Sequence, residues 1–249
     1  MSWEHILLVV AVGILTGFIN TLSGSGSLIS LPILMFIGLP PHVANGTNRI
    51  GIFFQNLVST TNYHRKGILD VRMGIGVAIP AILGSIAGAF VVTGLSERAV
   101  EISVAVVLLV MLVPLWLKPR QWLEGKDMTH VPQNKLLRFV IFFFVGMYGG
   151  YIQAGVGIFL LSALVLNAGY DLVKANALKV FINLIFTPFA LGVFIYLGHV
   201  DWGVGLVLAL GNAIGAWFAS QWSVAWGPVF VRYVLAVVIL GSGVKLLFF

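Results

Sequence analysis

The feature that most limits how this chain can fold is a series of long apolar stretches. Several approach the roughly 20 apolar residues that a helix needs to cross the hydrocarbon core of a bilayer. Only 9% of the residues are charged, against about a quarter in an ordinary soluble domain. The sequence therefore predicts an all-α membrane protein that crosses the bilayer several times. The longest stretches are His5 to Asn20, Val71 to Val92, Val100 to Leu117, Leu136 to Ile152 and Val204 to Phe218.

The basic residues gather between apolar stretches. Eight of the 14 lie in two short segments, one from Arg65 to Arg72 and one from Lys118 to Arg138. Because cytoplasmic loops of membrane proteins carry an excess of Lys and Arg, both segments are expected to be cytoplasmic. This pattern accounts for the net charge of +6, so no nucleic-acid partner is indicated. Cysteine is absent, which excludes disulfides and thiolate metal sites.

The chain aligns with itself, without a gap, when it is shifted by 131 residues. Apolar matches are common by chance in a membrane protein, so the informative matches are those of Gly, Asn and Asp. They include Gly24 with Gly155, Gly26 with Gly157, Asn45 with Asn176, Gly67 with Gly198, and Asp70 with Asp201. We therefore predict two homologous helical repeats, residues 1–118 and 132–249, joined by a cytoplasmic linker at residues 119–131.

Each repeat contains five hydrophobic segments, and the second of them is too short to cross a bilayer unaided. These short segments are Leu28 to Ile37 and Phe159 to Ala168, which we interpret as half-helices or arms of broken helices. If they count as crossings, the second repeat is inverted relative to the first, and 11 basic residues lie inside against 3 outside. Four crossings per repeat give 9 against 5. The inverted arrangement is favoured, with residues 1 and 249 extracytoplasmic and Arg65 and Gln121 cytoplasmic.

Two Gly-rich interruptions lie at corresponding places in the repeats, each just before a short segment. In a transporter, half-helix N-termini at such breaks can direct free N–H groups at a bound anion. Glycines could also serve a tight turn or a close helix contact, but their recurrence in both repeats favours a binding site. The candidate residues are Ser23, Gly24, Ser25, Gly26 and Ser27 in the first repeat and Gln153, Gly155 and Gly157 in the second.

A second element combines amides with a cation. Asn at a helix start is a good N-cap, so Asn45 and Asn176 are expected to begin helices, with Arg49 and Lys179 in the first turns. The helix macrodipole disfavours a cation there, and a bound anion would stabilise it. A lipid phosphate or snorkelling to the interface would explain these cations equally well. The candidate binding residues of this element are Asn45, Thr47, Asn48 and Arg49, with Asn176 and Lys179.

The remaining titratable residues give weaker indications. Asp70 and Asp201 open long segments and are expected to be N-caps. The histidines, among them His42 and His199, lie at segment ends or in the linker and are expected to face the interface. They show no paired ligand spacing, so neither a metal nor another cofactor is predicted. The sequence places no carboxylate at mid-membrane, where a proton relay would need one.

Several motifs taken together resemble a known family. Gly24 to Leu28, Gly38 to Asn48 and His64 to Asp70 are similar to the successive motifs of the TauE/SafE sulfite exporter family, also called the TSUP family. Gly198 to Trp202 resembles its second-half motif, although the second Gly-rich run, with Val156 and Ile158, departs from the pattern. The resemblance implies a carrier for sulfite, sulfonates, sulfoacetate or related organic anions in a prokaryotic inner membrane. The paired Gly-rich runs and the paired cations predict that the anion binds near mid-membrane between the two repeats.

Two other functions remain open at this stage. One is an intramembrane hydrolase with Ser23, Ser25 or Ser27 as nucleophile, although no histidine lies in a helix interior to shelter such a dyad. The other is a scaffold subunit that transports nothing, which leaves the polar residues of the paired interruptions unexplained. A non-enzymatic anion transporter is the favoured interpretation. Its expected partners are the small anion and the lipid bilayer, and a homo-oligomer is left open.

Overall fold

The computed structural model describes residues 3–110, 134–167, 170 and 172–248, and every regular element in this part of the chain is a helix. The predicted linker, Gln121 and the end of the stretch Val100 to Leu117 lie outside the described residues. The elements are α1 (Trp3–Ser23), α2 (Ser27–Phe36), α3 (Pro41–Arg65), α4 (Val71–Thr93), α5 (Glu97–Val110), α7 (Lys135–Tyr151), α8 (Val156–Ser162), the π-helix η3 (Ala163–Asn167), α9 (Leu172–Tyr196) and α10 (Trp202–Phe248).

The predicted all-α polytopic membrane fold is confirmed. Helices α1, α4 and α9, and α10 over Trp202–Trp226, are long and apolar enough to cross a membrane. Helix α3 has the same 25-residue length as α9 but buries many polar side chains. The two short segments form short helices, α2 with 10 residues and α8 with 7 residues continued by η3.

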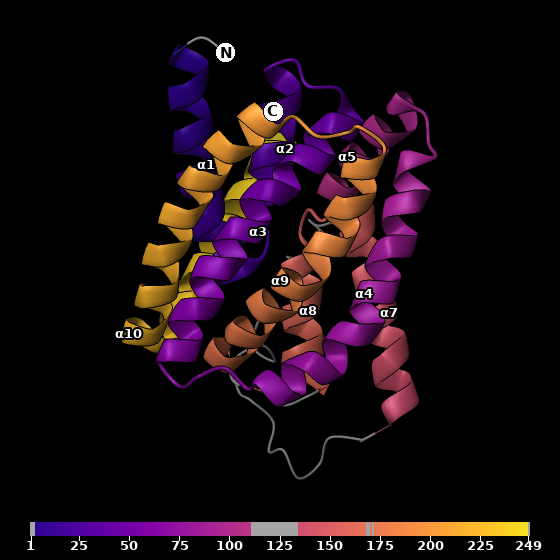
Figure 1. Ribbon diagram of the computed structural model, residues 1–249. Coiled ribbons are helices and arrows are strands. Elements are labelled where there is room, and N and C mark those ends of the chain that lie inside the picture. The colour runs from indigo at the N-terminus through magenta and orange to yellow at the C-terminus, as the bar shows by residue number, and fades with distance from the viewer. Residues whose placement is uncertain (1–2, 111–133, 168–169, 171, 249) are drawn as a thin grey trace.

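The long helices, with α10 taken over Trp202–Trp226, form two sets that run in opposite directions (Figure 1). Helix α10 packs along α1 and α3 in one set, and α4 packs along α7 and α9 in the other. Helices α3 and α9 begin at Pro41 and Leu172 and end at Arg65 and Tyr196, so both bounds differ by 131 residues. Helices related by this offset fall into opposite sets, as an inverted repeat requires. The division into two copies and the orientation in the membrane stay predictions.

Small residues four apart bring the two predicted repeats together. A Cβ added to Gly13 would stand 2.8 Å from the carbonyl oxygen of Leu208, and Gly17 lies against the backbone of Asn212, both on α10. Between α4 and α7, Gly88 lies against Met147 and Gly150 against Ser85 in the same way. These glycines let neighbouring backbones approach closely, as small residues do at helix interfaces in membranes.

The outer surface and the interior have the polarity expected in a bilayer. Large apolar side chains such as Ile79, Leu83, Phe90 and Leu210 are exposed, whereas many amides and hydroxyls are buried. Because lipid solvates apolar groups and offers no hydrogen bonds, this distribution turns polar groups towards the protein interior. The molecule therefore has a polar centre.

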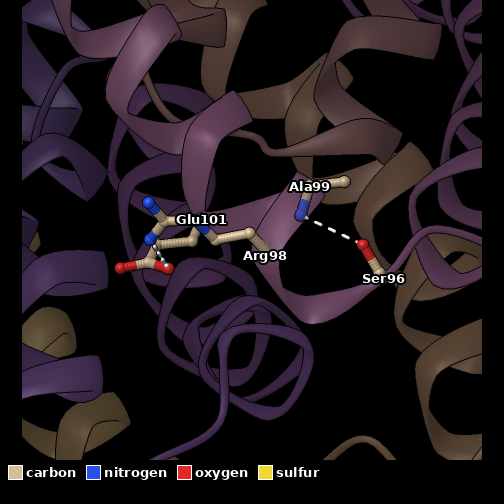
Figure 2. A network of polar contacts seen from close by, with 4 residues as sticks. All are labelled: Ser96, Arg98, Ala99 and Glu101. Carbon is tan, nitrogen blue, oxygen red and sulfur yellow. Dashed lines mark hydrogen bonds and ion pairs between the residues drawn. The ribbon is translucent and has the colours of Figure 1, made fainter.

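Polar residues also mark where helices begin. The side chain of Asp70 accepts a hydrogen bond from the Met73 N–H at 3.0 Å, and Asp201 accepts one from the Val204 N–H at 2.9 Å, so both predicted N-caps are confirmed. At the start of α5, Ser96 accepts from the Ala99 N–H, and Arg98 pairs with Glu101 at 2.8 Å (Figure 2). The side chain of Arg98 is 76% exposed, so this ion pair is a surface feature.

Candidate functional site

The two Gly-rich interruptions cross each other at the centre of the molecule. Helix α1 ends at Ser23 and α7 at Tyr151, and the chain then passes through Gly24 (φ +77°) and Gly155 (φ +74°). This left-handed backbone conformation favours glycine. A Cβ on Gly24 would overlap the Cα of Gly157, and a Cβ on Gly157 would overlap that of Gly24. The tight turn and the close helix contact, which the sequence offered as the alternative to a binding site, therefore both require these glycines.

Arg49 is completely buried and reaches the end of α7. Its Nη1 donates to the carbonyl oxygen of Gly149 at 3.0 Å and its Nη2 to that of Gly150 at 2.6 Å. Nη1 also donates to Gln153 Oε1 at 3.0 Å and Nη2 to Asn45 Oδ1 at 3.3 Å. The guanidinium carbon lies 4.6 Å from the centre of the Phe194 ring. Only Nε is left without a partner.

Lys179 makes the corresponding contact with the end of α1. It is 1% exposed, and its Nζ donates to the carbonyl oxygens of Asn20 at 3.1 Å and Thr21 at 2.7 Å and to Asn176 Oδ1 at 2.8 Å. A Cβ built on Gly157 would stand 3.1 Å from Lys179 Cδ, so the lysine stem lies over the crossing point of the two Gly-rich runs.

Each cation thus belongs to one predicted repeat and binds a helix end of the other. The last four carbonyls of a helix have no partner within it, and the helix end carries a partial negative charge. Arg49 and Lys179 satisfy such carbonyls on α7 and α1. Asn45 adds a third contact there, because its Nδ2 donates to the carbonyl oxygen of Tyr151 at 2.8 Å.

The predicted helix starts are wrong. Helix α3 begins at Pro41 and α9 at Leu172, so Arg49 and Lys179 lie about two turns inside their helices rather than in the first turns. Asn45 and Asn176 are likewise inside these helices and are not N-caps. Pro40 precedes α3 and makes no side-chain cap. The sequence offered Asn as a capping residue, but Pro41 is well suited to the first position of a helix and starts α3 earlier.

The candidate serines lie beside this centre and contact one another. Ser23 Oγ and Ser25 Oγ are 2.6 Å apart, and Ser23 Oγ also donates to the carbonyl oxygen of Ile19 at 2.8 Å. Ser27 is fully buried at the start of α2, and its hydroxyl has no partner. One turn along α2, Ser30 Oγ donates to Asn48 Oδ1 at 2.7 Å, which brings Asn48 next to the interruption.

Two predicted residues need a different account. Thr47 does not join the cations: its hydroxyl accepts a hydrogen bond from the Asp201 N–H at 2.9 Å and ties α3 to the start of α10. His42 does not face the interface but is 7% exposed and stacks on His199, with ring centres 5.0 Å apart. Nε2 of His42 lies 3.1 Å from the carbonyl oxygen of Leu95.

Several residues of the site were missed in the sequence. Gly149 and Gly150 supply carbonyls to Arg49, Phe194 supplies its ring face, and Thr187 accepts from Gln153 Nε2 at 2.9 Å. Backbone carbonyls leave no trace in a sequence. Gln153 is the non-glycine residue with positive φ in the described chain, at +61°, and this conformation directs its amide between Arg49 and Thr187.

With this geometry in place, comparison with known proteins identifies the family. The family model for the sulfite exporter TauE/SafE matches residues 9–246. The chain belongs to the TauE/SafE sulfite exporter family. This confirms the resemblance of its motifs and shows that the chain is a multi-pass membrane protein of a transporter family.

Curated relatives have the same general description. The chain is 28% identical over 252 residues to the probable membrane transporter protein ORF9 of a Sinorhizobium species, covering 99% of this chain and 94% of that protein. It is 25% identical over 240 residues to the probable membrane transporter protein YfcA of Escherichia coli K12, covering 95% and 87%. To YunE of Bacillus subtilis, another probable membrane transporter, it is 25% identical, covering 86% of each. No solved structure matches the chain.

Proposed function

We propose that this transporter carries a small oxyanion, such as sulfite, a sulfonate, sulfoacetate or a related organic anion, and binds it beside Arg49 and Lys179. The observation that carries the proposal is the pair of buried cations. Within the described residues, all their hydrogen bonds go to neutral oxygen atoms of backbone carbonyls and side-chain amides, so neither cation is paired with a carboxylate there.

The charge at this centre is only partly compensated. A helix C-terminus is equivalent to roughly half a negative charge, so two helix ends leave about one positive charge from the two cations. An unpaired charge in the membrane is costly and marks a functional site by default. At 4 Å and an effective dielectric constant near 20, attraction to an anion amounts to about 4 kcal/mol. One monovalent anion would balance the centre.

The unpartnered polar atoms around the cations suit an oxyanion. Asn48 Nδ2, Asn176 Nδ2 and Arg49 Nε are buried donors without an acceptor, and the Ser27 hydroxyl is also unpartnered. Sulfite and sulfonate oxygens accept hydrogen bonds and donate none in their ionised forms. The Gly24, Ser25 and Val156 N–H groups already donate within the protein. The predicted backbone donors to the anion would therefore have to come from Gly26, Ser27, Gly155 and Gly157.

The two alternatives have less support. For a serine hydrolase, Ser23 and Ser25 would need a base, but their hydroxyls bond each other and a backbone carbonyl. His42 and His199 are occupied with each other at the ends of α3 and α9. A scaffold that transports nothing leaves the donors around the cations without a role.

The test is flux into liposomes that contain the purified protein. Sulfite, sulfoacetate and a neutral solute would be offered under a set membrane potential to wild type, Arg49→Gln and Lys179→Gln. Removal of a charge that contacts the anion should cost about 1.5–3 kcal/mol, or roughly ten- to a hundredfold in affinity. The matched control is Arg98→Gln, which removes an exposed cation and should leave the affinity unchanged.

The test must distinguish a loss of anion binding from a loss of stability, because both cations also hydrogen-bond helix ends. Thermal unfolding is therefore measured with and without the anion, so that the anion-induced rise in Tm reports binding whatever the starting stability. Wild-type anion flux equal to that of empty liposomes would exclude the proposal. Normal flux and normal anion-induced shifts in both charge variants would preserve transport and remove the two cations from the site.

A further inference from the structure

One face of α3 is polar over the second half of the helix, after the buried Ile52, which lies about one turn beyond Arg49. From Gln55 onward, buried polar side chains recur every three or four residues, which places them along one side of the helix. We call this set the polar face of α3. It consists of Gln55, Asn56, Ser59, Thr60, Asn62 and Tyr63, each less than a tenth exposed.

The far end of the polar face is tied to neighbouring helices. Ser59 Oγ lies 3.1 Å from Thr21 Oγ1 of α1, Asn62 Nδ2 donates to Ser220 Oγ at 2.8 Å, and Tyr63 Oη lies 2.6 Å from Ser223 Oγ. The face thus passes between α1 and α10 on its way to the Arg65 end of the molecule.

The part of the face nearer Arg49, and Thr60 beside Ser59, have no such partners. Both amide atoms of Asn56 are buried without a hydrogen bond, as are Gln55 Oε1 and Thr60 Oγ1. On the neighbouring helices, Thr16 Oγ1 and both amide atoms of Asn212 are in the same condition. Buried polar atoms are normally satisfied by protein or water, and orphaned ones call for an explanation. A ligand that carries water, bound next to Asn56, would supply hydrogen-bond partners to these atoms.

The corresponding turns of α9 are mostly apolar, although Asn56 corresponds to Thr187, which is buried and accepts a hydrogen bond from Gln153 Nε2. By the 131-residue offset, Gln55 is replaced by Phe186, Ser59 by Ala190 and Tyr63 by Phe194. Phe186 and Phe194 are fully buried, and Phe194 covers the Arg49 guanidinium. The centre is therefore bordered by amides towards the Arg65 end and by aromatic rings along the second half of α9.

We propose that the polar face of α3 lines the half of the transport path that leads from Arg49 to the Arg65 end of the molecule. Gln55 and Asn56 form a neutral amide subsite on this path for a small oxyanion and the water that accompanies it. The subsite lies about 10 Å along the helix from Arg49. The inference rests on the proposed function and adds the direction in which the anion leaves the cations.

Cysteine labelling tests the path. The chain has no native cysteine, so Ser59→Cys can be compared with Ala190→Cys, its equally buried counterpart on α9. An anionic methanethiosulfonate is applied to membrane vesicles of both orientations, with sulfoacetate as the competing anion. We expect Ser59→Cys to react at least tenfold faster than Ala190→Cys, only from the side at which Lys66→Cys reacts, and more slowly in the presence of sulfoacetate. Equal slow reaction of Ser59→Cys and Ala190→Cys would overturn the proposal.

Replacement of the amide by an apolar group of similar size tests the subsite. Asn56→Leu should lower the flux of sulfoacetate at least tenfold and keep the anion-induced rise in Tm, because Arg49 and Lys179 are unchanged. Its Tm without anion should equal or exceed that of wild type, since the unpartnered amide is gone. Unchanged flux in Asn56→Leu would overturn the subsite. Failure of the proposed function itself would show as an absence of flux in wild type.

Discussion

Gly24 and Gly157 touch backbone to backbone, so that a side chain on either would overlap the other. Because these glycines belong to different predicted repeats, their contact fixes how closely the two helix breaks approach. It also places Lys179 above one break and within reach of the helix end that precedes the other. The distance between the two helix breaks, and with it the position of Lys179, therefore depends on this contact.

The first prediction concerns this crossing. Gly157→Ala should destabilise the protein by about 1–3 kcal/mol, the usual cost of overpacking, because backbone atoms must move to admit the methyl group. The matched control is Gly192→Ala in α9, where nothing lies within 4 Å of the added Cβ. Thermal unfolding in detergent measures both. Equal Tm values for the two variants would show that the crossing is looser than the structure indicates.

The second prediction separates the two tasks of Arg49. Its planar fork binds two carbonyls of α7 at once, which the single ammonium group of lysine cannot reproduce. Arg49→Lys should therefore lower the stability by about 1–3 kcal/mol through lost hydrogen bonds. The charge is kept, so the anion-induced rise in Tm should remain close to that of wild type. If the rise in Tm disappears in Arg49→Lys, as we expect it to in Arg49→Gln, the fork itself contacts the anion.

The third prediction is that the stability depends on pH through His199, which stacks on His42 near the start of α3. Burial, and then the neighbouring His42, lower the pKa of His199, against a smaller opposing effect of Glu97. The folded state therefore favours the neutral imidazole. Stability should be complete above the unfolded-state value of about 6.5 and should fall as the pH drops below it, until the lower folded-state pKa is reached.

The measurement is Tm at neutral pH and at successively lower pH for wild type and His199→Gln. The variant should lose less stability on acidification, whatever its Tm at neutral pH. His64→Gln, at an exposed position near the end of α3, should behave as wild type does. A wild-type Tm that rises on acidification would contradict the direction of the shift.

The fourth prediction is the orientation in the membrane. If the basic segments are cytoplasmic, Lys66→Cys should react with a membrane-impermeant maleimide only after the membrane is opened. Ser96→Cys, in the connection before α5 at the opposite end of α4, should react from outside in intact cells. Labelling of both from the same side is incompatible with α4 as a membrane span.

The sequence predicted the class of fold and the short helices, because hydropathy and glycine positions can be read from individual residues. It also singled out Arg49, Lys179 and the two Gly-rich runs, which lie together in the structure, and their role in binding stays a prediction. It did not predict where α3 and α9 begin. Asn45 has the chemistry of a cap, and only the three-dimensional structure shows that its amide donates to the carbonyl oxygen of Tyr151 in the other predicted repeat. The partners of Arg49 and Lys179 were missed for the same reason: they are backbone carbonyls at helix ends, which any residue can supply.

A stronger signal was present and unused. Asn45, Asn48, Gln55, Asn56, Ser59 and Tyr63 recur at helical spacing in a segment that had to be buried, and such a row marks an interior polar face. It identifies the side of α3 that faces the centre. No pattern in the sequence shows which of these amides lack partners, because that depends on α1 and α10.

The contact between Arg49 and α7 has a consequence for how the protein is made. During synthesis, α3 is complete long before residues 149 and 150 exist, so the guanidinium enters the bilayer without the carbonyls that later receive it. A charged residue at the middle of an inserting helix costs about 2.5–3.5 kcal/mol. We therefore expect the first half of the chain to stay incompletely packed until α7 is inserted and its carbonyls bind Arg49.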